Sequence, residues 1–201
     1  EIQIKTDWVE QLQMEYNLMI DSVKKYGGFF VGRYETSIDS TTGVASKYNQ
    51  LSMTQENSSG GTWYGMYQKQ KNFSGEVEET MQSSMIWGSQ YDAMLNWMLK
   101  GEDSSKVNAS IGNHSEKVNT GITSTDVINN IYDLSGNLCE FTLEAYDDSA
   151  RSYRGGCFKR NDSYPVTYEA PASYRAGKYP HAVPTTEGEK NITSRISLYI
   201  K

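Results

Sequence analysis

Residues 129–158 read NNIYDLSGNLCEFTLEAYDDSARSYRGGCF, and this stretch decides the fold. Two runs of strand-like composition, 138–145 and 152–158, flank the polar turn 147–150. Two such runs around a short polar turn predict a β-hairpin. Every second residue of the first run, Cys139, Phe141 and Leu143, is apolar, so we expect one face of this strand to pack inward.

The two cysteines lie within this predicted hairpin. Cys139 and Cys157 are about equally far from the turn, which predicts that they face each other on neighbouring strands. On the same face they would lie within disulfide reach. Two outcomes stay open, a disulfide and a pair of buried free thiols.

Length and charge bound the class of protein. The 201 residues, 37% of them hydrophobic, suffice for one well-packed domain spanning the chain. A net charge of −6 without a basic run argues against a nucleic-acid partner. No stretch reaches the roughly 20 apolar residues that a spanning helix needs, so we expect no membrane insertion.

Apolar periodicity outside the hairpin predicts further elements. A stripe of apolar residues within 1–26 is typical of an amphipathic helix that begins at Asp7 and ends before Gly27. Residues 63–71 and a segment from Ser89 to Gly101 predict two more helices. Aromatic and β-branched runs at 29–36 and 194–201 predict strands, and the polar segment 102–125 predicts a surface loop insertion.

The motif NIYDLSGNLCEFT at 130–142, followed by RGGCF at 154–158, resembles the NxYDLxGNVWEWT and RGGSW pair of the formylglycine-generating-enzyme-like family. The run FFVGRYET at 29–36 resembles the opening strand of this family, and SRISLYIK resembles its ending. The resemblance implies an α+β, C-type-lectin-type fold: small antiparallel sheets, two to three flanking helices and much loop. This sequence departs from the family at two positions together, with Cys139 for a tryptophan and Cys157 for a serine.

We expect no required cofactor, and the resemblance implies one structural calcium ion. Its matching positions here are the side chains of Asp133 and Glu140 and the backbone carbonyls of Gly136 and Leu138. Hard oxygen ligands in a turn suit calcium. The alternative is that Asp133 is an ordinary turn residue and Glu140 pairs with an arginine.

The enzymatic part of the resemblance is incomplete. Oxidases of the family use two cysteines just beyond the glycines with copper between them, whereas here Cys157 is followed by none up to Lys201. Related iron-dependent enzymes need three histidines, and this chain has only His114 and His181. Standard nucleophile and phosphate-loop motifs are missing as well. We expect a protein that is not an enzyme, with an oxidase that uses Cys157 as an alternative.

Segment 158–181 is rich in tyrosine, asparagine and proline, which is typical of a recognition surface, although a tyrosine-rich connector is the alternative. Between RGG and a final scaffold strand, it resembles the displayed region of retroelement-diversified variable proteins of phages and bacteria. The resemblance places a ligand-display region at 152–201 and implies these ligand-binding residues: Phe158, Lys159, Asn161, Asp162, Tyr164, Tyr168, Lys178, Tyr179 and His181.

The resemblance predicts a receptor-binding or adhesion domain of a phage tail or a bacterial surface protein. A structural virion or surface domain without a ligand is the alternative. Sugar-binding lectins of this broad fold commonly carry a Glu-Pro-Asn or Gln-Pro-Asp motif, and neither occurs here. We therefore expect a protein receptor or surface ligand rather than a glycan.

Overall fold

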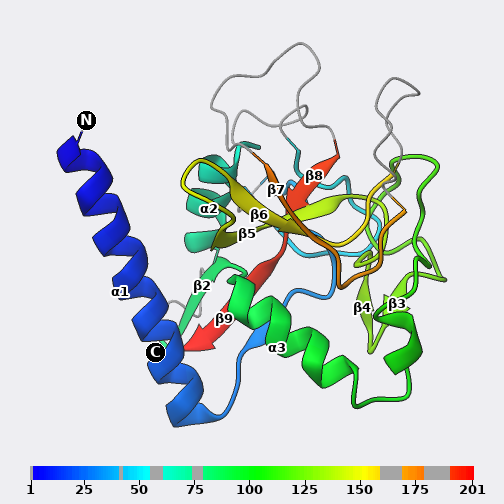
Figure 1. Cartoon of the computed structure of the whole chain (residues 1–201), viewed down its shortest axis with the longest axis horizontal. Coiled ribbons are helices and arrows are strands. Elements are labelled where there is room, and N and C mark those ends of the chain that lie inside the picture. Colours follow the sequence, from blue (N-terminus) through cyan, green and yellow to red (C-terminus); the bar gives the residue numbers. More distant parts are fainter. Residues whose placement is uncertain (1, 41–42, 55–60, 74–78, 159–168, 179–190) are drawn as a thin grey trace.

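A computed structural model of the chain describes residues 2–40, 43–54, 61–73, 79–158, 169–178 and 191–201, with only the backbone for 2–7. The described residues form an α+β fold (Figure 1). Its helices are α1 (Ile2–Tyr26), α2 (Trp63–Lys71) and α3 (Gly88–Met98). Its strands are β1 (Phe30–Val31), β2 (Met81–Met85), β3 (Val127–Ile128), β4 (Ile131–Tyr132), β5 (Cys139–Ala145), β6 (Arg151–Arg154), β7 (Arg175–Lys178), β8 (Ile192–Ser194) and β9 (Ile196–Ile200).

The strands form three small sheets. The largest has the order β7-β6-β5-β8, in which β5 and β8 are parallel and the other pairs are antiparallel. A second, antiparallel sheet has the order β1-β9-β2, and β3 pairs with β4 in a hairpin. Strands β8 and β9 are separated only by Arg195, so one C-terminal segment passes from the first sheet into the second.

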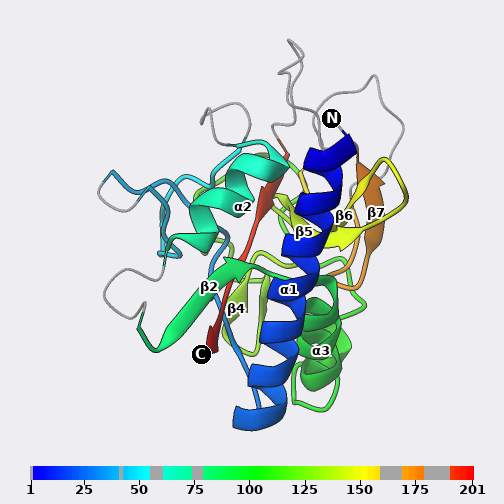
Figure 2. The ribbon, with the colours of Figure 1, turned by 90° about the vertical axis from the view of Figure 1, so that its left-hand side faces the viewer.

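Helix α1 confirms the predicted amphipathic helix. Its inner face buries Met19, and Trp8, Tyr16 and Val23 pack beside it against the core. The helix lies along one side of the molecule, beside β2 and α3 (Figure 2). It begins at Ile2, so the start predicted at Asp7 is wrong, since no glycine or proline precedes Asp7 to stop the helix.

The ends of these helices follow known capping patterns. Gly27, with φ of +84°, ends α1 by donating its N–H to the Val23 carbonyl at 2.8 Å. Helix α2 has its predicted bounds, and the Thr62 hydroxyl accepts the N–H of Gly65 at its start. Helix α3 begins at Gly88 rather than at a cap on Ser89, because the Gln90 side chain accepts the N–H of Trp87.

The predicted hairpin is strands β5 and β6. Asp147 shapes its turn, since its carboxylate accepts the backbone N–H groups of Ser149 and Ala150 at 2.8 and 2.7 Å. The expected division of β5 into an apolar inner face and an outer face is wrong, because Glu140 and Thr142 are buried as well. Strand β5 lies between β6 and β8 and is covered on both faces, as a central strand.

Three other expectations differ in extent. The predicted strand 29–36 is β1 alone, although Gly32 and Thr36 still donate to carbonyls of the C-terminal segment at 2.8 and 2.9 Å. The predicted final strand 194–201 is interrupted at Arg195. Segment 102–125 contains only the 3₁₀ turn Ser104–Lys106, yet Val107 and Thr120 are buried, so it is packed onto the domain.

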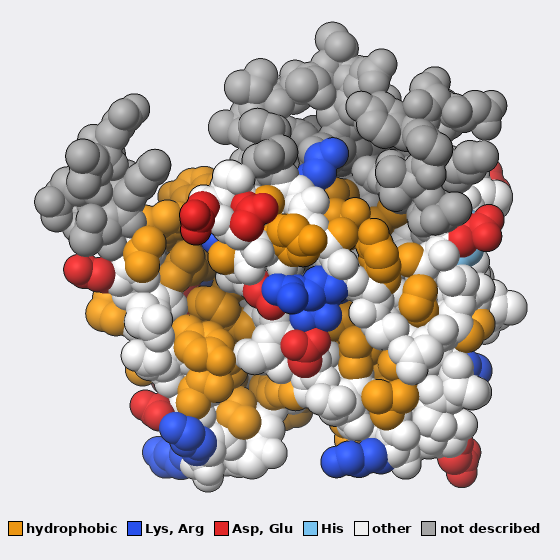
Figure 3. Space-filling model, viewed as in Figure 1, with side chains coloured by type: hydrophobic (Ala, Val, Ile, Leu, Met, Phe, Trp, Pro, Cys, Tyr) orange, Lys and Arg blue, Asp and Glu red, His pale blue; other side chains and the backbone are white. Residues whose placement is uncertain are grey.

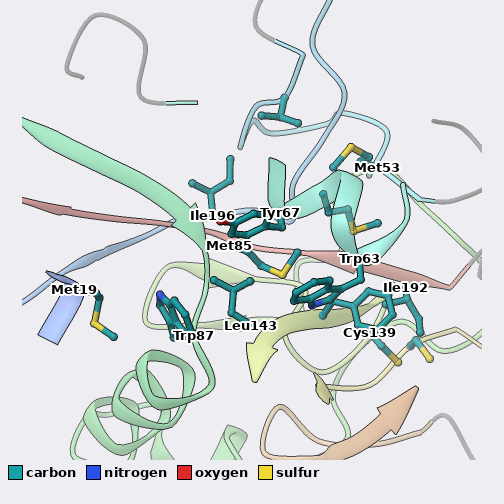
Figure 4. Close-up of a cluster of buried hydrophobic side chains, with 14 of the residues drawn as sticks. Met19, Met53, Trp63, Tyr67, Met85, Trp87, Cys139, Leu143, Ile192 and Ile196 are labelled. Carbon is teal, nitrogen blue, oxygen red and sulfur yellow. The ribbon is translucent and has the colours of Figure 1, made fainter. Parts of the chain in front are cut away.

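The main apolar cluster joins α1, α2 and the two larger sheets. Trp63, Tyr67 and Met85 lie at its centre, with Trp87 and Leu143 beside them (Figure 4). On the face drawn in Figure 3, acidic and basic side chains are interspersed among apolar ones. None of the described helices is long and apolar enough to cross a membrane.

Candidate functional site

The RGG motif ends β6 and leads into the predicted ligand-binding segment. Buried Arg154 pairs with Asp92 at 2.8 Å and with Glu144 at 3.4 Å. Gly155 has φ of +77°, and a Cβ added there would lie 2.3 Å from the carbonyl oxygen of Leu134. Only glycine tolerates this conformation and this contact, so the chain leaves the sheet at a fixed place against the NIYDLSGN segment.

Two residues of the predicted ligand-binding set lie in the described part of the chain. Phe158 is partly buried, and its N–H donates to the Asn137 carbonyl at 2.9 Å. Lys178 is exposed at the end of β7, opposite Arg151 of β6. The others lie outside the described residues: Lys159, Asn161, Asp162, Tyr164, Tyr168, Tyr179 and His181.

Described residues before, within and after this segment are anchored by hydrogen bonds to the backbone. The Ser135 hydroxyl donates to the Ala170 carbonyl at 3.2 Å, and Gly155 donates its N–H to the Tyr174 carbonyl at 3.1 Å. Before β8, the Asn191 carbonyl accepts the N–H of Cys139 at 2.9 Å. The NIYDLSGN segment and the start of β5 therefore fix the chain on both sides of the predicted segment.

A buried group of charged side chains contacts the NIYDLSGN segment and the start of β5. We call this group the charged centre: Glu35, Asp126, Asp133, Glu140 and Arg195. Arg195 is completely buried and its guanidinium binds the Glu140 carboxylate. It also donates to the carbonyls of Gly32 at 2.8 Å and Tyr132 at 2.7 Å. One side chain thus joins the C-terminal segment to β5, to the end of β1 and to β4.

Glu35 performs a similar function for the loops. Its carboxylate accepts the side-chain amide of Asn137 at 2.7 Å, the backbone N–H of Leu138 at 3.0 Å and the hydroxyl of Ser52. Burial raises the pKa of Glu35 well above its usual range, and the charges of Asp133 and Glu140 raise it further.

The two aspartates border the β3–β4 hairpin. Asp126 accepts the N–H of Ser135 at 3.1 Å, and Asp133 accepts the N–H of Gly121 at 2.6 Å through Oδ2. The Oδ1 atom of Asp133 is buried and has no hydrogen-bond partner among the described residues. Burial, followed by the charge of Asp126, raises the pKa of Asp133 to about 7. A proton on this carboxyl is therefore stable near neutral pH.

The side chains of the predicted calcium site make other contacts in the structure. The Glu140 carboxylate is bound by the Arg195 guanidinium, which is the alternative predicted for Glu140. Of the two side chains predicted to bind calcium, Asp133 keeps a buried oxygen that has no partner among the described residues. No group of three or more side chains suited to a metal occurs among the described residues. A dication beside a guanidinium is electrostatically unfavourable. Calcium binding at these positions stays a prediction.

Cys139 and Cys157 are both buried, and both are free thiols in the structure. They pack in the same apolar cluster, and the nearby Cys157 thiol helps to raise the pKa of Cys139, although the two residues are not cross-strand partners. Ala145 pairs with Arg151 as the predicted turn requires, but an irregularity between Phe141 and Ala145 shifts the register. The expected pairing of Cys139 opposite Cys157 is therefore wrong, while their proximity is correct. A disulfide between them stays a prediction.

Sequence reasoning missed a surface cluster of tyrosines near the charged centre. The Tyr34 ring lies 5.1 Å from that of Tyr132 and 6.0 Å from that of Tyr48, between ring centroids. Gly121, with φ of +77°, leaves room for these rings, since a Cβ there would lie 2.5 Å from the Tyr34 ring. The signal that could have found the cluster was the excess of tyrosine, 15 against 5 phenylalanines.

The sequence also gave a signal for the charged centre. Arg195 is the only charged residue between Asn191 and Ile200, a segment that otherwise reads as a buried strand. A lone charge in such a strand requires a buried partner, which sequence alone does not identify.

Comparisons with known proteins give little further guidance. No family model matches the chain, and no curated protein matches it. Among solved structures, one described as "Crystal Structure of CarF" is similar to this chain with a TM-score of 0.48 and 12% sequence identity. The similarity covers 94% of this chain and 83% of that one. A likeness this weak supports no argument about fold family or function.

Proposed function

We propose that this chain is a non-enzymatic ligand-binding domain with a C-type-lectin-type, formylglycine-generating-enzyme-like fold, similar to retroelement-diversified variable proteins. Its ligand-binding residues are those predicted between RGG and the C-terminal strands. Its ligand is a surface protein rather than a glycan, and its place is a phage tail or a bacterial surface.

The observation that supports the proposal is the anchoring of the chain on both sides of this segment. Before it, Gly155 has a positive φ and lies where a Cβ would meet the Leu134 carbonyl oxygen at 2.3 Å, and Phe158 is hydrogen-bonded to Asn137. After it, the Asn191 carbonyl accepts the N–H of Cys139. Fixed ends lower the entropy lost on binding, because fewer backbone conformations must be excluded when the ligand arrives.

A binding survey with matched variants tests the proposal. The labelled domain is incubated with a panel of bacterial strains, each also treated with protease or with periodate, and cell-bound label is measured. Protease should abolish binding to a protein receptor, whereas periodate should abolish binding to a glycan. On a responsive strain, Tyr164→Ala with Tyr179→Ala should weaken binding more than about tenfold, since interface tyrosines commonly contribute over 1 kcal/mol each.

The control is Tyr26→Ala, which removes an exposed tyrosine at the end of α1, far along the chain from the predicted segment. This variant should bind like the parent protein. Melting temperatures of all variants are measured first, so that a folding defect is not mistaken for lost binding. Full binding by the double variant would refute the site, and no binding to any strain would favour a structural domain without a ligand.

A further inference from the structure

The two thiols lie where three segments of the fold meet. Cys139 begins β5, and Cys157 follows the RGG turn. Asn191, which precedes β8, contacts both: its carbonyl accepts the N–H of Cys139 at 2.9 Å, and its side-chain amide donates to the sulfur of Cys157 at 3.6 Å. Both side chains pack in one apolar cluster, so this junction brings the two thiols together in the interior.

The turn at Gly155 and Gly156 brings about this proximity. Glu140 pairs with Arg154, which places Gly155 rather than Cys157 opposite Cys139. The positive φ of Gly155 then redirects the chain, and Cys157 packs in the same apolar cluster as Cys139. The backbone on both sides is held by hydrogen bonds, so the two side chains meet without any rearrangement of the sheet.

We propose that Cys139 and Cys157 form a redox couple, a dithiol under reducing conditions and a disulfide under oxidising conditions, that crosslinks β5 to the end of the RGG turn. The oxidant is a small-molecule disulfide. One protein thiolate attacks it and releases one small thiol, and the other protein sulfur then displaces the second. The protein loses two protons and two electrons, and the small disulfide leaves as two thiols.

Burial sets the kinetics of this couple. Both thiols are shielded from solvent, and burial, with the neighbouring Cys157 thiol, raises the pKa of Cys139. Little Cys139 thiolate is therefore present at neutral pH, and exchange requires local opening of the junction, so oxidation through Cys139 is slow. The same shielding protects the disulfide from reductants once it has formed.

Oxidation closes a loop of about 19 residues around the β5–β6 hairpin. A crosslink of this length should raise the melting temperature by about 5–10 °C in a chain of this size. Backbone amides at residues 155–158 and 191–193 should exchange more slowly with deuterium. If the proposed function holds, the stiffer junction should also lengthen ligand residence, and this consequence alone rests on that function.

The test uses the folded full chain, equilibrated with oxidised glutathione or with dithiothreitol. Each sample is quenched with acid and then unfolded in urea at neutral pH in the presence of N-ethylmaleimide, which labels free thiols. The mass of the intact protein is then measured. The oxidised sample should be lighter by two hydrogens and unlabelled, should melt at the higher temperature, and should return to two labelled thiols in dithiothreitol. Two labelled thiols, or glutathione adducts alone, after oxidation would overturn the proposal.

Cys139→Ala and Cys157→Ala are the matched controls, and their melting temperatures under reducing conditions are recorded first. Neither should gain thermal stability from oxidised glutathione. If either fails to fold, the wild-type protein alone decides, because mass and melting temperature are read from its two redox states. None of these readouts requires a ligand, so failure of the redox couple and failure of the binding proposal are distinguishable.

Discussion

The apolar cluster around Trp63 and the charged centre around Arg195 are both buried, yet they hold the chain in different ways. Trp63, Tyr67 and Met66 connect α2 to the sheets mainly through contact area, which is insensitive to direction, and one directed bond adds to it, from Trp63 Nε1 to the Thr142 carbonyl at 2.8 Å. Arg195 connects three other segments through directed hydrogen bonds to Glu140, Gly32 and Tyr132. The free energy of unfolding should therefore fall less when an apolar side chain changes shape than when one partner of a buried hydrogen-bond network is removed.

The largest effect should come from Arg195→Met. Removing the guanidinium leaves the Glu140 carboxylate buried without its partner, so the free energy of unfolding should fall by about 3–5 kcal/mol. Urea denaturation measures the change. The double variant Arg195→Met, Glu140→Leu should recover much of the loss, because no charge remains unpaired.

Arg195→Lys is the milder companion variant, since lysine keeps the charge but loses the planar donors. It should be less stable than the parent and more stable than Arg195→Met. Equal stability of the Met variant and the parent protein would show that the charged centre is not the more sensitive region.

The apolar cluster should respond to size rather than to chemistry. Met66 is fully buried, so Met66→Ala should cost about 2–4 kcal/mol through lost contacts and a cavity. Met66→Leu, which keeps the volume, should cost less than about 1.5 kcal/mol. The same urea titration gives both values, and a Leu variant as unstable as the Ala variant would remove the contrast with Arg195.

Asp133 should give the charged centre a pH dependence that the apolar cluster lacks. The pKa of this carboxyl is about 7 in the fold, above the value of about 3.9 in an unfolded chain. Between these values the folded state binds more protons, so stability is greatest at low pH and falls as pH rises from about 4 to 7.

The measurement compares wild type with Asp133→Asn, which cannot ionise and tolerates the positive φ of this position. The wild-type free energy of unfolding should fall across this range by about 3 kcal/mol more than that of the variant. Glu35, Asp126 and Glu140 also have raised pKa values and are present in both proteins. Because the Asp133 charge raises the pKa of Glu35, the difference reports Asp133 together with its effect on Glu35. Identical slopes would contradict the assignment.

Calcium should have the smallest effect. Because Arg195 already binds Glu140, millimolar calcium or a chelator should shift the melting temperature by less than about 1 °C. Differential scanning fluorimetry is sufficient for this test. A rise of several degrees with calcium that is lost in Glu140→Gln would support the predicted calcium ligands.

Much of the fold could be predicted from periodicity. The stripe from Trp8 to Val23 predicts α1, and the polar turn before Arg151 predicts the β5–β6 hairpin. Strand β2 was missed because its sequence is MQSSM, and small serines such as Ser83 and Ser84 give no apolar signal although they are buried. Most of the predicted ligand-binding residues lie outside the described residues, so their site stays a prediction.

The sequence by itself determined the α+β class, the helices, the hairpin and the nearness of Cys139 to Cys157, because these depend on neighbours a few residues apart or symmetric about one turn. Only the tertiary structure decided that Glu140 faces Arg195, that Glu35 accepts from Leu138 and that β5 is covered on both faces. These partners lie 55 and 103 residues apart. A buried charge is stable only when a segment distant in the sequence supplies its partner, and local sequence patterns do not show which segment that is.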